Sequence, residues 1–218
     1  MALEVCRSCA SVALASGPNP SSGMTIETVS RKDFEEQLET VRAFAPGGAE
    51  GVFGLASVIW RVDREAAIFL DAGRAVLLQL AHPWVAAAIS ENLRTFTDPI
   101  GRFHRTFGVV FGMVFGSLDQ AVASARRLHR RHAAVQGHLA TAVGAFAAGS
   151  CYRANEIAAL RWVHATLTET ALLMHDLVVG PLGNDERERY YEESKLFAAL
   201  FGIPRDCLPL DWASVRGL

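Results

Sequence analysis

Apolar residues recur at helical spacing along most of this chain. Two segments show this clearly, and in the first of them the arginines lie mostly on the face opposite the apolar stripe. One helix is predicted from Ser117 to about Ala148, and its apolar stripe consists of Ala121, Ala125, Leu128, His132, Val135 and Leu139. A second is predicted from Asn155 to about Val179, with a stripe of Ile157, Leu160, Val163, Leu167, Ala171, Met174 and Val178. No segment alternates apolar and polar residues over a useful length, so the pattern predicts helices and no strands.

Prolines, glycines and capping residues set the bounds of further helices. Helices are expected over residues 31–44, about 63–81 and 84–93. Another is expected to begin at Pro99, with Asp98 as its N-cap, and a last one runs from Asp185 to just before Gly202. Residues 1–23 are small and polar, which predicts a disordered tail. The expected fold is therefore all-α, a single-domain helical bundle over residues 49–218. Residues 1–48 are expected to form an N-terminal tail with one short amphipathic helix.

The composition agrees with this fold class and narrows the function. Half of the 218 residues are hydrophobic, with Ala and Leu prominent, and both residues favour helix. The net charge of −2 gives no electrostatic field for a nucleic-acid partner. The four cysteines, two of them in Cys6-x-x-Cys9, form neither a disulfide framework nor a zinc motif, so a reducing, cytoplasmic location is expected.

The most apolar run, Phe107 to Leu118, is too short to cross a membrane, which takes about 18–20 apolar residues. Its glycines, Gly108, Gly112 and Gly116, repeat every four residues and predict a buried helix with a face of small residues. No transmembrane span is expected, whereas contact with a membrane surface stays open.

Several polar side chains interrupt the apolar stripes, and such groups need partners when they are buried. His132 lies at the centre of its stripe and His129 at the edge, so helical spacing leaves both as interior candidates. His164 borders the second stripe, where a histidine either bonds to neighbouring backbone or supports a ligand pocket. Arg102 and Thr106 share a helix face, and an inward arginine needs an anion, either Asp98 or a cofactor propionate.

The motifs of several enzyme classes are missing from the sequence. These include Glu-x-x-His, His-Glu-x-x-His, Gly-x-Ser-x-Gly and the phosphate-binding loop. Haem iron can be held by one imidazole without any carboxylate ligand, and it suits an apolar helical slot. An iron porphyrin would also neutralise the basic and imidazole groups that the pattern places inside the bundle.

An ordered set of short motifs runs through roughly residues 50–212. It consists of Arg74, Ala81-His82-Pro83-x-Val85-Ala86-Ala87, Asp98-Pro99-x-x-Arg102-x-x-x-Thr106, Arg126-x-x-His129, Tyr152-x-Ala154, Trp162-Val163-His164-Ala165-Thr166-Leu167, and Gly202-Ile203-Pro204 followed by Leu208-Pro209. In this order the motifs resemble the rubber oxygenase (latex-clearing protein) and mycophenolic-acid oxygenase family. The resemblance implies an all-helical fold with haem b on a single histidine.

The resemblance also implies roles for particular residues. It places the iron ligand at His129 and carries Arg102 and Thr106 to catalytic positions near the haem. Arg126, in the same motif as the ligand, and His164 are expected to help bind the cofactor.

This sequence departs from the rubber oxygenases at several positions. Arg105, also expected near the cofactor, falls where those enzymes have a lysine that approaches the iron, and an arginine stays protonated and ligates poorly. The catalytic carboxylate of the rubber oxygenases has no clear counterpart, since Glu91 is the nearest acid and its spacing is wrong. Cleavage of polyisoprene is therefore not expected. Family domains usually continue beyond Leu208-Pro209 with further helices, so a truncated C-terminus is also expected.

The function expected from these observations is that of a haem-b-dependent oxygenase acting on a hydrophobic small molecule. One alternative is a cofactor-free helical binding protein that uses the Gly108, Gly112 and Gly116 face to pack a partner. Another is a pseudoenzyme of the same fold.

Overall fold

The structure, a computed structural model, describes residues 27–46, 50–66, 72–91 and 99–215. The predicted tail of residues 1–23, the Cys6-x-x-Cys9 pair and the Asp98 cap lie outside the described residues. The helices in the first half are α1 (Arg31–Phe44), α2 (Val58–Asp63), α3 (Ala72–Leu80), α4 (Pro83–Glu91), α6 (Pro99–Val114) and α7 (Leu118–Ala133). The strands β1 (Gln136–His138) and β2 (Cys151–Arg153) precede α8 (Ile157–Met174), the π-helical turn η4 (His175–Val179), α9 (Asn184–Leu200), the 3₁₀ turn η5 (Arg205–Cys207) and α10 (Trp212–Val215).

The predicted mostly helical fold is confirmed, and local capping explains where two of its helices begin. At α1 the Ser30 hydroxyl accepts from the Asp33 backbone N–H, and the Asp33 carboxylate accepts from the Ser30 N–H. Ser117 and Gln120 form the same reciprocal pair at α7, as the sequence predicts for Ser117. These bonds satisfy backbone donors that a helix N-terminus otherwise leaves open.

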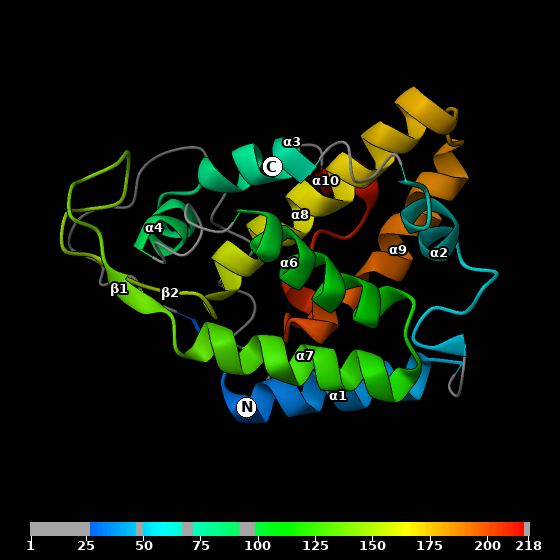
Figure 1. Ribbon diagram of the computed structural model, residues 1–218, viewed down its shortest axis with the longest axis horizontal. Helices are drawn as coiled ribbons and strands as arrows, with labels where there is room; N and C mark the ends of the chain where they lie inside the picture. Colours follow the sequence, from blue (N-terminus) through cyan, green and yellow to red (C-terminus); the bar gives the residue numbers. More distant parts are fainter. Residues whose placement is uncertain (1–26, 47–49, 67–71, 92–98, 216–218) are drawn as a thin grey trace.

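One helix, α9, lies at the centre of the bundle. It packs against α1, α2, α6, α7, α8 and α10, while α6 packs along α7 and α3 along α8. Figure 1 shows α7 and α1 side by side along one edge of the molecule, with α6 above them. The shared core therefore joins segments from both ends of the described chain.

The first helix belongs to this core. Phe34, Leu38 and Val41 of α1 are buried in the same apolar cluster as residues of α6, α7, α8 and α9. The short amphipathic helix predicted within residues 1–48 is therefore observed with its predicted bounds, and it packs on the bundle.

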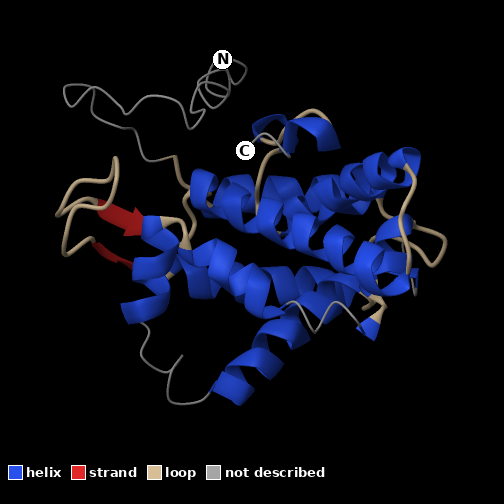
Figure 2. Cartoon of the chain, turned by 90° about the horizontal axis from the view of Figure 1, so that it is seen from above, coloured by secondary structure: helices blue, strands red, loops and turns tan. Residues whose placement is uncertain are grey.

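The predicted helix from Ser117 to about Ala148 is wrong beyond Ala133. There the chain forms a two-stranded antiparallel sheet, in which Gly137 pairs with Tyr152, at one end of the bundle (Figure 2). Gly144 and Gly149 in the connecting loop take left-handed backbone angles, with φ of 57° and 79°, that end any regular helix. Strands of three residues are too short to show the period of two by which strands are recognised.

The predicted helix over about 63–81 is also wrong in part. Val58–Asp63 forms a helix of its own, and the next described helix begins at Ala72. No helix in the described part of the chain is long and apolar enough to cross a membrane.

Candidate functional site

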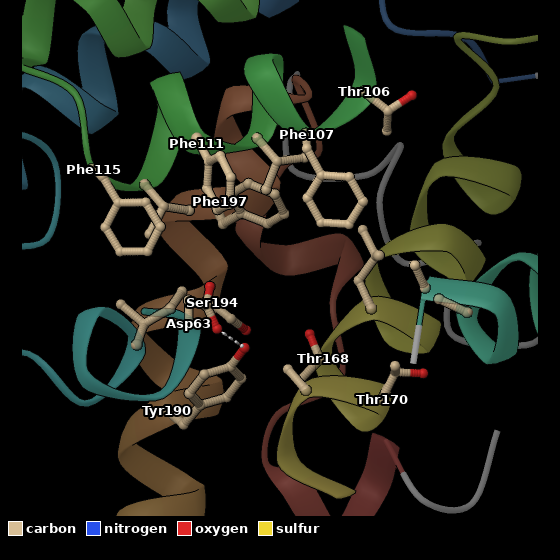
Figure 3. A pocket seen from close by; sticks show the side chains of 17 residues that line it. Asp63, Thr106, Phe107, Phe111, Phe115, Thr168, Thr170, Tyr190, Ser194 and Phe197 are labelled. Carbon is tan, nitrogen blue, oxygen red and sulfur yellow. Dashed lines mark hydrogen bonds between the residues drawn. The ribbon is translucent and has the colours of Figure 1, made fainter. Parts of the chain in front are cut away.

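A cavity of about 120 Å³ lies inside the bundle, between α2, α3, α6, α8 and α9. Figure 3 shows its two sides, with aromatic rings gathered along α6 and most of the polar side chains opposite them. Polar groups in its lining come from Asp63, Thr106, Thr168, Thr170, Tyr190 and Ser194. Mostly apolar cavities with a few placed polar groups are the usual form of small-molecule sites.

The aromatic side of the cavity follows from a spacing of four residues along α6. Phe107 and Phe111 of α6, and Phe115 directly after its end, therefore lie on one side, and consecutive ring centroids are 5.8 and 5.5 Å apart. Phe197 of α9 adds a fourth ring to the lining. This part of the wall offers dispersion contacts to an apolar ligand.

The principal polar pair joins α2 to α9. The Tyr190 hydroxyl donates to Asp63 Oδ1 at 2.8 Å, as Figure 3 shows. Burial raises the pKa of Asp63 to about 7, although the hydrogen bond from Tyr190 acts in the opposite direction. Burial, together with the Asp63 charge, raises the pKa of Tyr190 well above its ordinary value. Near neutral pH the cavity therefore holds a carboxyl group that can either donate or accept a hydrogen bond.

A row of threonines on α8 supplies further hydroxyls. Thr166, Thr168 and Thr170 are all buried, and the Thr168 hydroxyl points into the cavity (Figure 3). Thr170 accepts a hydrogen bond of 2.7 Å from Arg74 of α3, which also pairs with Glu169 at 2.5 Å. These bonds fix α3 against α8 on one side of the cavity.

Thr106 is the one predicted site residue whose described side chain lines the cavity. Because it is itself exposed, the cavity opens to solvent near this residue. Arg105 beside it is exposed as well. The side chain of Arg102 lies outside the described part of the structure, although its backbone lies in α6.

Helices α6 and α7 form an antiparallel hairpin. It can be used to compare, along the helix axes, the position of the predicted iron ligand on α7 with that of Arg102 and Thr106 on α6. A Cβ on Gly112 would lie 2.6 Å from the Ser124 Oγ, which fixes these two positions opposite each other. Counting along two antiparallel helices from that point puts Thr106 at the level of Arg130 and Arg102 at the level of Ala134. On this count His132 lies between these two levels, and His129 lies opposite Phe107, one residue beyond Thr106.

His129 itself lies at the interface of α7 with α1. Its ring stacks on Phe34, with centroids 4.1 Å apart and an angle of 7° between the planes. The Nδ1 atom is buried and has no hydrogen-bond partner among the described residues. Burial lowers the pKa of His129, so its imidazole is neutral at neutral pH, the form that ligates metals. His129 does not line the cavity described above.

His132, the other candidate from helical spacing, is in a similar electrostatic state. Burial and the neighbouring His129 lower its pKa to about 4. Both imidazoles of α7 are thus neutral near pH 7. The choice between them as iron ligand stays a prediction.

Two other predicted cofactor residues are bonded within the chain. Arg126 makes a two-point contact with Glu35 of α1, with N···O distances of 3.1 and 2.5 Å. His164 is buried, and its Nε2 lies 3.0 Å from the Ser194 carbonyl oxygen. This is a bond to backbone, one of the two alternatives that the sequence left open for His164. Burial lowers the pKa of His164 to about 4. These side chains therefore brace α7 against α1 and α8 against α9.

The described residues contain no group of three or more His, Cys, Asp or Glu side chains arranged to hold a metal ion. Any metal ion bound by the described residues would therefore have fewer than three such side chains as ligands. A haem iron meets this condition, because the porphyrin supplies four of its ligands.

The fold and the site thus define a mostly helical protein with an apolar cavity inside its bundle. Residues 60–218 match the family described as ER-bound oxygenase mpaB/B'/Rubber oxygenase, catalytic domain, and the chain belongs to this family. The resemblance drawn from the ordered motifs is therefore confirmed, and membership suggests an oxidoreductase. No match to the chain was found among the curated proteins or among the solved structures.

Apart from Thr106, sequence reasoning did not find the polar residues of the cavity. Asp63 stands in a charged stretch, Arg61-Val62-Asp63-Arg64-Glu65, which has the composition of a solvated helix end. Tyr190 lies 127 positions further along and reaches it only through packing of α2 on α9. One signal was available, namely the alternating Thr166, Thr168 and Thr170 in a mostly apolar helix.

Proposed function

We propose that this chain is a haem-b-dependent oxygenase that acts on a hydrophobic small molecule. The observation that carries the cofactor assignment is the buried Nδ1 of His129, which has no partner among the described residues. A buried polar atom of this kind is costly unless something binds it. In an oxygenase family, a haem beside this imidazole is the partner that fits the chemistry.

The fit of His129 to this role rests on three properties of the described residues. The imidazole is neutral near pH 7, its ring is oriented by the stack on Phe34, and counting along α6 and α7 places it opposite Phe107, next to Thr106. The Glu35–Arg126 pair holds α1 and α7 together one turn away.

In this proposal the haem supplies the oxygen chemistry, and the chain supplies binding, orientation and exclusion of water. His129 ligates the iron, and Arg102 pairs with a propionate group. Thr106 offers a hydroxyl at the mouth of the apolar cavity. Arg105, Arg126 and His164 complete the proposed cofactor-binding set, the last two by holding the surrounding helices in place.

A visible absorption spectrum tests the proposal. Protein expressed with iron and a haem precursor is expected to show a Soret band, and His129→Ala is expected to lose most of it. His132→Ala is the matched control, because it removes the other neutral imidazole of the same helix. Circular dichroism establishes that both variants are folded.

Each contrary spectrum has a separate meaning. If His132→Ala loses the band and His129→Ala keeps it, the iron ligand is His132 and the haem assignment stands. If the wild-type protein shows no Soret band and gains none on titration with haemin, haem b is not its cofactor.

The alternative of a cofactor-free binding protein loses its main support. Gly112, central to the small-residue face, is used within the chain for the close approach of α6 to Ser124 of α7. That face is therefore not free as a whole for a partner helix.

A further inference from the structure

We propose that the cavity between α2, α3, α6, α8 and α9 binds an apolar ligand with a single neutral polar end, a hydroxyl or carbonyl, held by Asp63 and Tyr190. As the substrate site of an oxygenase, this assignment rests on the proposed function. As a binding site it needs no haem, because the residues that carry it belong to this chain alone.

The first argument is the division of the cavity into two sides. Phe107, Phe111 and Phe197 form much of the apolar wall, while the Asp63–Tyr190 pair and the Thr168 hydroxyl lie across from it (Figure 3). A ligand that fills such a space buries a hydrocarbon body against the rings. Its polar end meets the hydrogen-bonding groups.

The second argument is the unused capacity of the Asp63 carboxyl. Among the described residues, the Tyr190 hydroxyl is the group that hydrogen-bonds to this carboxyl, and the contact engages Oδ1. A carboxyl has two oxygens and accepts or, when protonated, donates at the second. An oxygen-bearing ligand end supplies the missing partner.

The third argument concerns the charge of the ligand. The described lining contains no Arg or Lys, so a carboxylate end would be buried without a counter-ion. Asp63 is the one carboxyl of that lining, and its raised pKa allows both its protonated and its ionised form near pH 7. A neutral hydroxyl serves both forms, because it accepts from the acid and donates to the carboxylate. A ketone serves only the acid form.

The ionisable groups on the surrounding helices have other partners. Glu193 of α9 accepts from the Ile59 backbone N–H at 2.8 Å, and Arg74 of α3 pairs with Glu169 of α8. Arg61 of α2 pairs with Glu186 of α9, and α6 presents exposed His104 and Arg105 near the cavity mouth. Tyr190 stays protonated throughout the neutral range. The pH dependence of ligand binding is therefore assigned to Asp63.

Calorimetry with four eight-carbon probes tests the inference on haem-free and haem-loaded protein at pH 6 and pH 8. Octan-1-ol is expected to bind similarly at both pH values. Octan-2-one is expected to bind at pH 6 and about tenfold more weakly at pH 8, because Asp63 loses its proton. Octanoate is expected to bind more weakly than the alcohol at both pH values, and octylamine more weakly at pH 6, where Asp63 is largely protonated.

Substitution of Asp63 distinguishes specific recognition of the polar end from nonspecific hydrophobic binding. Asp63→Asn keeps a donor at all pH values, so octan-2-one binding should lose its pH dependence. Asp63→Leu should reduce binding of the alcohol by about tenfold, to the level of 1-chlorooctane, while 1-chlorooctane binds as before. Asp119→Asn, on the exposed start of α7, is the control and should change neither result.

The inference is overturned if the four probes bind equally, if octylamine binds most tightly at pH 6, or if Asp63→Asn leaves the ketone profile unchanged. Ligand binding without a Soret band would remove the haem proposal and keep this one. A Soret band without binding of any probe would do the reverse.

Discussion

At the scale of single residues, this bundle contains buried ionisable groups whose pKa values shift in opposite senses. Burial raises the pKa of Asp63 to about 7 and lowers that of His164 to about 4. Both shifts favour the neutral form, as expected for groups removed from water without a counter-ion. Stability should therefore fall as pH drops below about 6.5 because of His164, and fall as pH rises towards 7 because of Asp63.

The Asp63 contribution gives the first stability prediction. Its folded pKa is above its unfolded value, so the stabilisation is complete below about pH 3.8 and is lost as pH rises through about 7. The loss is at most about 1.4 kcal/mol per pH unit. Asp63→Asn should lack this loss and should unfold at higher urea concentration than the wild type at pH 8.

Urea midpoints measured at pH 5 and pH 8 check this result. Asp119→Asn serves as the exposed control, and any shift of its midpoint from the wild type through the lost helix-terminal charge should be the same at both pH values. A midpoint difference between Asp63→Asn and wild type that is the same at pH 5 and pH 8 would contradict the assigned pKa.

At the scale of secondary-structure elements, the hairpin of α6 and α7 depends on one glycine. A Cβ at Gly112 would meet the Ser124 Oγ at 2.6 Å, whereas a Cβ at Gly108 meets nothing within 4 Å. Ser124 is buried, and its hydroxyl accepts a 2.8 Å hydrogen bond from Arg127. The helices can therefore be this close only while position 112 lacks a side chain.

Gly112→Ala is accordingly expected to destabilise the protein by about 1–3 kcal/mol through overpacking. Gly108→Ala, in the same helix, should instead stabilise it by up to about 1 kcal/mol, because alanine favours helix. Thermal or urea unfolding measures both effects.

A double variant identifies the contact responsible. Ser124→Ala removes the Oγ and leaves its Cβ at 3.5 Å from the added methyl group, an ordinary packing distance. Gly112→Ala combined with Ser124→Ala should then recover part of the stability lost in Gly112→Ala. If the double variant is no better than the sum of the single ones, the Oγ is not the obstacle.

At the scale of the whole molecule, α1 and α9 link the two ends of the described chain in one core. Leu38 of α1 is 0 % exposed, while Leu210 near the C-terminus is 85 % exposed. Through Phe34 and Glu35, the same helix also contacts His129 and Arg126 of α7. The proposed cofactor ligand is therefore oriented by a segment outside residues 60–218.

Leu38→Ala should lower the free energy of unfolding by about 2–5 kcal/mol, the usual cost of truncating a buried leucine. Leu210→Ala, chemically the same change at an exposed position, should alter it by less than about 0.5 kcal/mol. Far-ultraviolet circular dichroism and tryptophan fluorescence should give coincident unfolding curves. A separate early transition in Leu38→Ala would show that α1 unfolds independently of the bundle.

Much of the secondary structure could be predicted from the sequence, because helix signals are local. The bounds of Arg31–Phe44, the cap at Ser117 and the breaks before Asn184 depend on residues within a few positions of one another. The ordered motifs likewise identify the family without any coordinates. These features depend only on the order of the residues along the chain.

Only the tertiary structure decided the short sheet, the cavity and the partners of the polar side chains. Asp63 and Tyr190 are 127 positions apart, and Arg126 meets Glu35 across 91 positions, so neither contact has a signal in local spacing. Packing also decides whether a histidine in an apolar stripe bonds to backbone, as His164 does, or keeps a buried nitrogen without a partner among the described residues, as His129 does. The physical reason is that desolvation and hydrogen bonding depend on what surrounds a group in space, whereas helix formation depends mainly on its neighbours along the chain.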